Sequence, residues 1–174
     1  TIDNVMREIL HIRQYYPIYE RIHFVDETLN ANPTRFRNLC RALGKEKITW
    51  TGNCRAETWM DLSVLRLMKT SGCQLVEIGI ESGVQSVLDQ ANKGTKISHI
   101  QQFLQSAKDV GLPVIGTVMV PHVSDTSDTL KQSVAILTRW AKDYPLMVFP
   151  LQTMVFPASP YEKECKQYGV VVDN

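Results

Sequence analysis

The segments QLVEIGI (residues 74–80) and PVIGTVMV (residues 113–120) are short, rich in β-branched residues and almost continuously apolar. Strands of this composition are typical of parallel sheets that are covered by helices. Between them, residues 98–110 carry apolar side chains at helical spacing. A strand, a helix and a second strand in this order predict a βαβ unit and a parallel sheet.

The same pattern extends in both directions along the chain. Strands are predicted at RIHFV (21–25), ITWTGN (48–53) and about residues 147–155 from their β-branched and aromatic residues. Helices are predicted at residues 4–16, 33–43, 61–71, 84–91, 98–110, 127–142 and 160–168. We therefore predict one α/β domain over residues 1–174, in which a first helix is followed by five βα units.

Two architectures accommodate five βα units. A complete eight-unit barrel takes about 250 residues, so this chain of 174 residues corresponds to a partial TIM-type (β/α) barrel with about five parallel strands. The alternative is an open, doubly wound sheet with helices on both faces. In either architecture, ligands bind beyond the carboxyl ends of the strands.

Capping residues predict where the helices begin and end. Asn32 precedes a proline in the manner of an N-cap, and Gly44 is predicted to end that helix. Ser98 and Gln101 have the spacing of a capping box. The helix at 127–142 is expected to bury a stripe formed by Leu130, Val134, Leu137 and Ala141.

Composition and charge argue against several classes of protein. With 44% apolar and 21% charged residues the chain has the composition of a globular protein, and its net charge of +1 gives no support for nucleic-acid binding. No apolar run approaches the roughly 18 residues of a membrane helix, and the first residues lack a signal-peptide pattern. We expect a cytoplasmic protein with no nucleic-acid or membrane partner. Because Thr1 is not an initiator methionine, the chain is expected to be part of a longer protein.

The four cysteines, Cys40, Cys54, Cys73 and Cys165, are too widely spaced for a zinc or iron-sulfur motif. We expect this chain to hold no metal cluster of its own and no disulfide. Cys40 and Cys165 fall on apolar helical stripes, which predicts buried thiols. Cys54 follows a strand without an accompanying base, so a structural role is favoured there too.

Polar side chains follow the predicted strands, at the edge of the sheet where ligands bind. They are Asp26 and Glu27, then Asn53 and Arg55, then Glu81 and Ser82, then Pro121 and His122, then Pro157 to Ser159. Carboxylates and an arginine from neighbouring strands can hold an amino group, a carboxylate and ribose hydroxyls in one site. The alternative is a solvated network of surface ion pairs, which contributes little to stability.

Several segments resemble the core of radical S-adenosylmethionine (radical SAM) enzymes, in the order expected for that family. The similarity is greatest to the iron-sulfur oxidoreductases that often carry a cobalamin-binding domain. The family fold is an open barrel of about six βα units, and residues 1–174 resemble its strands two to six. The segments are FVDETL (24–29), CRAE (54–57), LSVLRLMKTSGC (62–73), VEIGIESGVQSVLDQANKGT (76–95) and PASPYEKECKQYG (157–169).

This resemblance implies that a first strand and a C-x-x-x-C-x-x-C cluster-binding loop lie upstream of Thr1. The longer protein would use a 4Fe-4S cluster and S-adenosylmethionine, with cobalamin as a further cofactor in the resembling subgroup. It would cleave S-adenosylmethionine to a 5′-deoxyadenosyl radical that acts on a small-molecule substrate. The chain by itself lacks the cluster ligands and is expected to be inactive.

The resemblance also assigns roles to residues that follow the first two strands. Asp26 and Glu27 correspond to the acidic element near the methionyl amino group of the cofactor. Arg55 corresponds to an arginine after the next strand of the family. These residues would position the cofactor, and no acid-base catalyst is assigned.

Two later positions complete the implied cofactor site. Glu81 and Ser82 correspond to the polar pair that faces the cofactor ribose. Pro121 lies where the family often has Gly-x-Pro-Gly-x-Thr, which helps to seat the adenine. In this chain the segment VMVPHVSDT (118–126) lacks both glycines, so the adenine contact departs from the family pattern.

Two other functions remain open from the sequence. One is a cluster-free barrel relative that binds a small molecule or a partner, and the upstream sequence would distinguish it by the absence of clustered cysteines. The other is a lyase or aldolase fragment, for which no lysine or metal-ligand set is evident at the strand ends. In a chain that lacks its first strand, RIHFV (21–25) would present an unpaired edge, so we expect self-association there.

Overall fold

The computed structural model describes residues 1–154 and residue 162, and helices and strands alternate over residues 1–154 as predicted. Pro157 to Ser159, the helix predicted at 160–168, apart from residue 162, and Cys165 lie outside the described residues. No helix in the described part has the length and apolar composition needed to cross a bilayer. The elements are α1 (Ile2–Tyr15), β1 (Arg21–Phe24), α2 (Pro33–Lys45), β2 (Thr49–Cys54), α3 (Leu62–Thr70), β3 (Cys73–Glu81), α4 (Gln85–Gln90), α5 (Ile97–Val110), β4 (Val114–Met119), α6 (Ser127–Asp143) and β5 (Leu146–Leu151).

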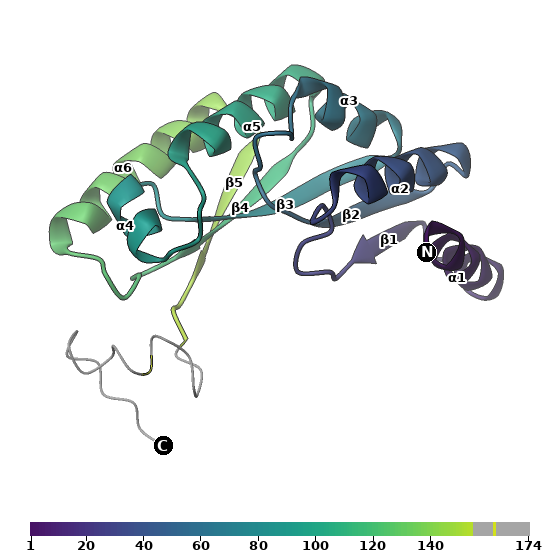
Figure 1. The fold of residues 1–174 in the computed structure, drawn as a ribbon, viewed down its shortest axis with the longest axis horizontal. Coiled ribbons are helices and arrows are strands. Elements are labelled where there is room, and N and C mark those ends of the chain that lie inside the picture. Colours follow the sequence, from purple (N-terminus) through teal and green to yellow (C-terminus); the bar gives the residue numbers. More distant parts are fainter. Residues whose placement is uncertain (155–161, 163–174) are drawn as a thin grey trace.

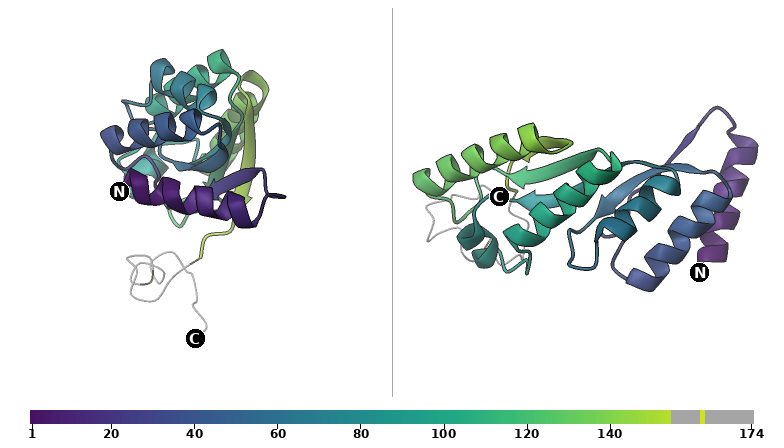
Figure 2. Two further views of the ribbon diagram at one scale, coloured as in Figure 1. Left: turned by 90° about the vertical axis from the view of Figure 1, so that its right-hand side faces the viewer. Right: turned by 90° about the horizontal axis from the view of Figure 1, so that it is seen from above.

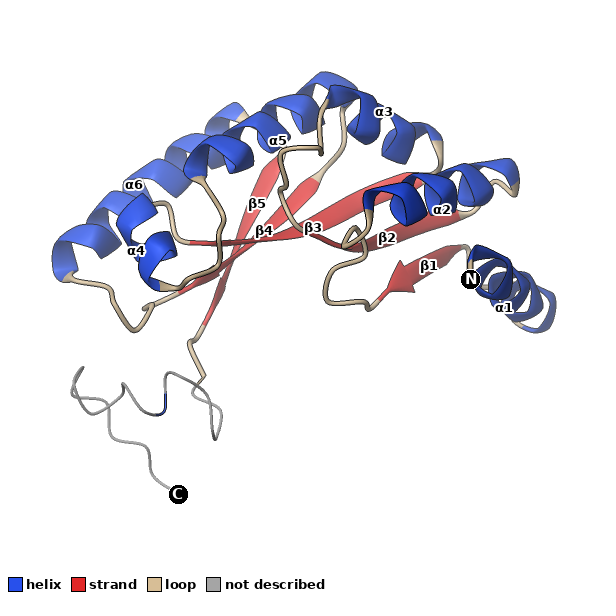
Figure 3. Cartoon of the chain, in the orientation of Figure 1, coloured by secondary structure: helices blue, strands red, loops and turns tan. Residues whose placement is uncertain are grey.

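The five strands form one parallel sheet in the order β1-β2-β3-β4-β5 (Figure 1, Figure 3). Helices α2 to α6 lie along one face of this sheet, and α1 packs against α2 near the β1 edge (Figure 2). A doubly wound sheet would reverse its strand order and carry helices on both faces. The sequential order therefore agrees with the predicted partial barrel and excludes the doubly wound alternative.

Alternation of side chains along each strand separates the two faces of the sheet. In β3, Val76, Ile78 and Ile80 are buried in the core beneath the helices, whereas Glu77 and Glu81 lie on the opposite face and are half-buried. No helix among residues 1–154 covers this opposite face (Figure 1). It corresponds to the inner surface of the partial barrel, and ligand sites of such folds lie at the carboxyl ends of the strands.

Trp50 of β2 lies at the centre of the core beneath the helices. Its ring makes edge contacts with Phe24 and Phe36, at centroid separations of 6.1 and 6.4 Å. Its Nε1 donates a hydrogen bond to Ser71 O at 3.1 Å, so burial leaves no unpaired donor. Cys40 of α2 is buried in the same core, as the helical stripe predicted.

The N-terminus of α2 is as predicted, but its C-terminus is different. Asn32 is the N-cap and its side chain accepts a hydrogen bond from Arg35 N at 2.9 Å. Gly44 was expected to end the helix, yet it lies inside α2, and the chain turns at Lys47 with φ of 51°. A Cβ at position 44 would lie 3.1 Å from Ser71 Cα, so the glycine permits close packing of α2 against residue 71.

Two other predictions about helices are wrong. No side chain caps α5 at Ser98 or Gln101, because the helix begins earlier, at Ile97, and the Gln85 side chain accepts from Ile97 N at 2.9 Å. In α6 the predicted stripe is displaced, since Val134 is 55% exposed. The buried positions are Ser133, Leu137 and Trp140, and the polar Ser133 is buried because its hydroxyl accepts from Gly83 N at 2.8 Å.

We expect Gly72→Ala to destabilise the fold more than the matched change Gly111→Ala. Both glycines have positive φ, +96° at Gly72 and +64° at Gly111. A Cβ added at Gly72 would lie 2.2 Å from Ile48 O, whereas a Cβ added at Gly111 would have no atom within 4 Å. The left-handed conformation alone costs about 1–2 kcal/mol, and the clash at Gly72 should add about 1–3 kcal/mol. Urea unfolding measures both losses, and equal losses would contradict this account.

Candidate functional site

A cavity of about 490 Å³ opens on the inner face of the sheet at its carboxyl edge. Strands β2, β3 and β4 form its floor, and the loops after β1, after β2 and between α4 and α5 form its rim. The lining combines three carboxylates with an arginine and a lysine. The lining residues are Glu27, Thr28, Asn53, Cys54, Arg55, Glu77, Gly79, Glu81, Asn92, Lys93 and Thr117.

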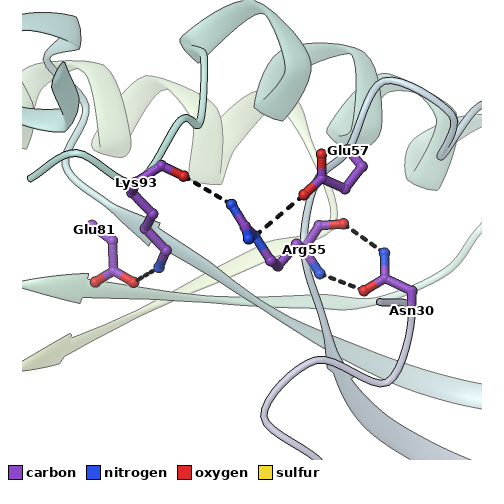
Figure 4. A network of polar contacts seen from close by, with 5 residues as sticks. All are labelled: Asn30, Arg55, Glu57, Glu81 and Lys93. Atoms are coloured by element: carbon purple, nitrogen blue, oxygen red, sulfur yellow. Dashed lines mark hydrogen bonds and ion pairs between the residues drawn. The ribbon is translucent and has the colours of Figure 1, made fainter. Parts of the chain in front are cut away.

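Asn30 joins the loops that follow β1 and β2. Its Nδ2 donates to Arg55 O at 2.9 Å, and its Oδ1 accepts from Arg55 N at 2.8 Å (Figure 4). The Asn30 side chain is buried, with 1% exposure, and a third hydrogen bond runs from Leu29 N to Asn53 O at 2.9 Å. Both backbone groups of Arg55 are therefore fixed, and with them the position from which its side chain enters the cavity.

The Arg55 side chain reaches across the cavity rim to the loop between α4 and α5. Its Nη2 donates to Lys93 O at 2.8 Å (Figure 4). Its Nε lies 3.3 Å from Glu57 Oε1, close enough for an ion pair but without the alignment of a hydrogen bond. Because the Arg55 and Glu57 side chains are about 40% exposed, their ion pair contributes little to stability. The contact with Lys93 O is the structural link between the two loops.

The side chain of Lys93 extends to the floor of the cavity, where its ammonium group pairs with Glu81 (Figure 4). The ion pair occupies space that Gly79 leaves open, since a Cβ at Gly79 would lie 2.6 Å from both Lys93 Nζ and Glu81 Oε1. Glu81 itself has φ of 63°, and the register with β4 shifts between Gly79 and Glu81. A strained, non-glycine residue at the end of a strand is typical of functional sites.

Three of the six residues predicted to bind the cofactor line this cavity: Glu27, Arg55 and Glu81. They come from the ends of three neighbouring strands, as expected from the parallel sheet. The link from Arg55 to Lys93 and the pairing of Lys93 with Glu81 form a half-buried network inside a cavity. The alternative of a solvated surface network describes the exposed pair of Arg55 with Glu57, whereas the pair of Lys93 with Glu81 is half-buried.

The other three predicted residues do not line the cavity. Asp26 is exposed in the loop after β1, and Pro121 is exposed after β4, where its carbonyl accepts a hydrogen bond from Thr153. Ser82 is 2% exposed and directed at α6, where its hydroxyl lies 3.4 Å from Ser133 Oγ. Their cofactor-binding roles stay predictions, and the structure brings none of these side chains to the cavity.

His122 is a buried, hydrogen-bonded residue of the loop after β4. Its Nδ1 lies 2.8 Å from Ser124 Oγ, and its backbone N–H donates to Asp125 Oδ2 at 2.8 Å. Burial lowers the pKa of His122, and the negative charges of Asp125 and Glu81 only partly oppose this effect. The imidazole is thus held neutral behind the carboxyl edge of β4.

Cys54 lines the cavity but is only 3% exposed. Burial raises the pKa of its thiol well above the usual value, so the group is protonated and unreactive at neutral pH. Within residues 1–154 and 162, no group of three or more histidine, cysteine or acidic side chains could hold a metal ion.

Sequence reasoning missed three residues of the site: Asn30, Glu77 and Lys93. A signal existed for Glu77, because a charged residue inside the apolar strand LVEIGI is rarely buried without a function or a partner. Lys93 lies in the segment NKGT that carried the resemblance, but nothing local places it over β3. Asn30 gave no signal, because its partner is the backbone of a residue 25 positions later.

Comparison with known proteins gives one consistent result. A profile of the Radical SAM superfamily matches residues 1–132. An uncharacterised methyltransferase of Pyrococcus horikoshii is 26% identical over 146 residues, which cover 83% of this chain and 31% of the relative. The cytidylyl-2-hydroxyethylphosphonate methyltransferase of Streptomyces wedmorensis is 26% identical over 181 residues, which cover 98% of this chain and 33% of the relative.

A solved structure shares the fold. The radical S-adenosylmethionine methyltransferase TsrM from Kitasatospora setae, with cobalamin and a 4Fe-4S cluster bound, matches with a TM-score of 0.81 and 14% identity. The match covers 96% of this chain and 34% of TsrM. This chain therefore spans about a third of the length of the relatives and of TsrM.

Asn30→Ala is expected to destabilise the protein by about 1–3 kcal/mol, because it leaves the N–H of Arg55 without a partner, while Arg55 O keeps its hydrogen bond from Glu57 N. The matched control is Asn38→Ala, which removes an exposed side-chain contact to Arg41 and should change stability by less than about 0.5 kcal/mol. Chemical denaturation measures both variants. A loss at Asn30 no larger than at Asn38 would show that the pairing does not hold the two loops.

Stability is expected to rise with pH through the titration of His122. Since burial lowers its pKa in the folded protein, the unfolded chain, with a pKa near 6.5, binds the proton that the folded protein excludes. Stability is therefore lost as the pH falls below about 6.5. His122→Asn, which keeps an acceptor near the position of Nδ1, should flatten the profile between about pH 5 and 7. An unchanged slope in denaturation curves would rule out this origin.

Proposed function

The chain belongs to the radical SAM superfamily, and we propose that it forms the S-adenosylmethionine-binding part of a longer, cobalamin-dependent radical methyltransferase. Two relatives are named as methyltransferases, and TsrM is a methyltransferase with cobalamin and a 4Fe-4S cluster bound. These names favour transfer of a methyl group over the oxidoreductase activity expected from the resemblance. The observation that carries the proposal is the cavity into which Glu27, Arg55 and Glu81 converge.

The cavity fits S-adenosylmethionine by charge and by the kinds of groups it offers. The methionyl end of the cofactor is a zwitterion, and Glu27 and Arg55 supply a carboxylate for its ammonium and a cation for its carboxylate. Glu81 offers carboxylate oxygens as acceptors for ribose hydroxyls. Because Lys93 already pairs with Glu81, ribose binding has to share or replace that ion pair.

A 4Fe-4S cluster does not fit the described part of the chain, because no set of cysteine ligands is present there. We assign the cluster to the longer protein and derive no step through it from these residues. When bound in a complete enzyme, S-adenosylmethionine supplies the 5′-deoxyadenosyl radical that is general to the family. The residues of this chain bind and orient the cofactor and hold the loops that cover it.

We expect Glu81→Gln to weaken binding of S-adenosylmethionine to this chain by about tenfold or more, because a charged hydrogen-bond acceptor is lost at the ribose. Isothermal titration calorimetry measures the affinity. Glu8→Gln, an exposed change on α1 away from the cavity, is the control and should leave the affinity unchanged. Equal affinity in both variants would remove Glu81 from the cofactor site.

The proposed enzymatic activity, cleavage of S-adenosylmethionine, can be tested with the longer protein. After anaerobic reconstitution with iron and sulfide and reduction, it should release 5′-deoxyadenosine, and this chain alone should not. Absence of a cluster and of 5′-deoxyadenosine in the longer protein would contradict the proposal. That outcome would favour the cluster-free relative that binds a small molecule.

A further inference from the structure

Glu77 lies deeper in the cavity than the residues proposed to bind S-adenosylmethionine. It precedes Glu81 by four positions on β3, which is roughly 13 Å along an extended strand. It is half-buried on the inner face and lines the cavity. Glu81 is paired with Lys93, whereas no hydrogen bond or ion pair of the Glu77 side chain occurs with any residue of the described chain. A carboxylate that is partly removed from water and has no protein partner can take a cationic ligand as its partner.

Asn53 adds a second unsatisfied acceptor beside Glu77. The two residues are register partners on the adjacent strands β2 and β3. Asn53 Oδ1 is buried and has no hydrogen-bond partner among the described residues. Two acceptor oxygens cannot pair with each other, so a ligand that donates hydrogen bonds would complement both of them.

On its other side, Glu77 is next to an apolar surface. Its register partner on β4 is Ile115, and the partner of Ile115 on β5 is Met147. Ile115 and Met147 line a second cavity of about 420 Å³, which lies toward the amino ends of β3, β4 and β5 and is formed mainly by apolar side chains. Met147 and Phe149 are 64% and 51% exposed, which is unusual for large apolar side chains on a sheet face. The Glu77–Ile115 pair is thus the boundary between a polar and an apolar cavity.

We propose that this boundary is a binding subsite for an amine with an apolar body. The protonated amine donates to Glu77 and Asn53, and the apolar body covers Ile115, Met147 and Phe149. Charge decides the occupant, because a carboxylate and an amide oxygen favour a cation with N–H donors over an anion or a neutral apolar molecule. The inference rests on the proposed function, which assigns the carboxyl-edge residues to S-adenosylmethionine and leaves this subsite to the second substrate.

The test is a titration of the 174-residue chain with phenethylamine, followed by NMR through the backbone amides of Glu77, Ile115 and Met147. Phenethyl alcohol, which has the same body without the charge, should bind at least about tenfold more weakly. Glu77→Gln should weaken phenethylamine binding by a similar factor and remove the preference over the alcohol. Glu46→Gln, an exposed change beyond the C-terminus of α2, is the matched control and should change neither affinity.

A second variant separates binding from folding. Met147→Ser alters an exposed side chain, so the fold should persist, while phenethylamine should bind several-fold more weakly and ethylamine should be unaffected. Equal binding of phenethylamine and phenethyl alcohol, or equal binding by Glu77→Gln and the unaltered chain, would overturn the inference.

Titration of the same sample with S-adenosylmethionine distinguishes this inference from the proposed function. Shifts at Arg55 and Glu81 with S-adenosylmethionine, but none at Glu77 with the amine, would overturn the amine subsite and leave the proposed function standing. Shifts at Glu77 with the amine alone would support the subsite and count against the cofactor assignment. Absence of both would overturn both.

Discussion

The sequential order of the five parallel strands is the constraint on which the rest of this structure depends. Each strand pairs with the next one along the chain, and helices α2 to α6 cover the same face of the sheet (Figure 1). One face therefore forms the hydrophobic core, and every strand ends at the same edge. The loops that follow the strands gather at that edge, which brings residues separated by up to 90 positions, Glu27 and Thr117, around one cavity.

The strand order brings the loops together but does not fix their positions. A series of polar contacts between the loops fixes them. Asn30 holds the backbone of Arg55, the Arg55 side chain holds the carbonyl of Lys93, and the Lys93 ammonium pairs with Glu81. The pairing of the buried Asn30 amide is the strongest of these constraints, because it makes two hydrogen bonds to Arg55 and its loss would leave the Arg55 N–H unpaired. The exposed pair of Arg55 with Glu57 contributes little, so the network acts mainly by positioning charges around the cavity.

Two cavities of different chemistry adjoin on the sheet. The polar cavity lies toward the carboxyl ends of β2, β3 and β4, and the apolar cavity lies toward the amino ends of β3, β4 and β5. Glu77 lies at the boundary, and it has no partner among the described residues. In the proposed methyltransferase, the carboxyl edge and the interior of the same face would serve two different molecules, a cofactor with ribose and charged ends and a substrate with an apolar body.

The sequence by itself determined the identity of the elements. Apolar, β-branched segments such as LVEIGI and VIGTVMV and the helical stripes between them specify the order of strands and helices, because strand and helix periodicities are local properties. The parallel sheet then places the residues after the strands at one edge, so Glu27, Arg55 and Glu81 were identified as neighbours. The exceptions are the helix ends, where packing of Gly44 against residue 71 and the Gln85 contact to Ile97 replaced the expected caps.

Only the tertiary structure decided which side chains enter the site. Alternation along β3 places Ser82 on the helix-covered side with Ile78 and Ile80, where its hydroxyl faces α6. The register shift between Gly79 and Glu81 and the positive φ of Glu81 are set only in the folded sheet. The roles of Asn30 and Lys93 depend on contacts with residues 25 and 12 positions away, across loops whose paths no local pattern specifies. Local periodicity encodes which face a strand residue occupies, whereas these long-range contacts exist only once the strands have paired.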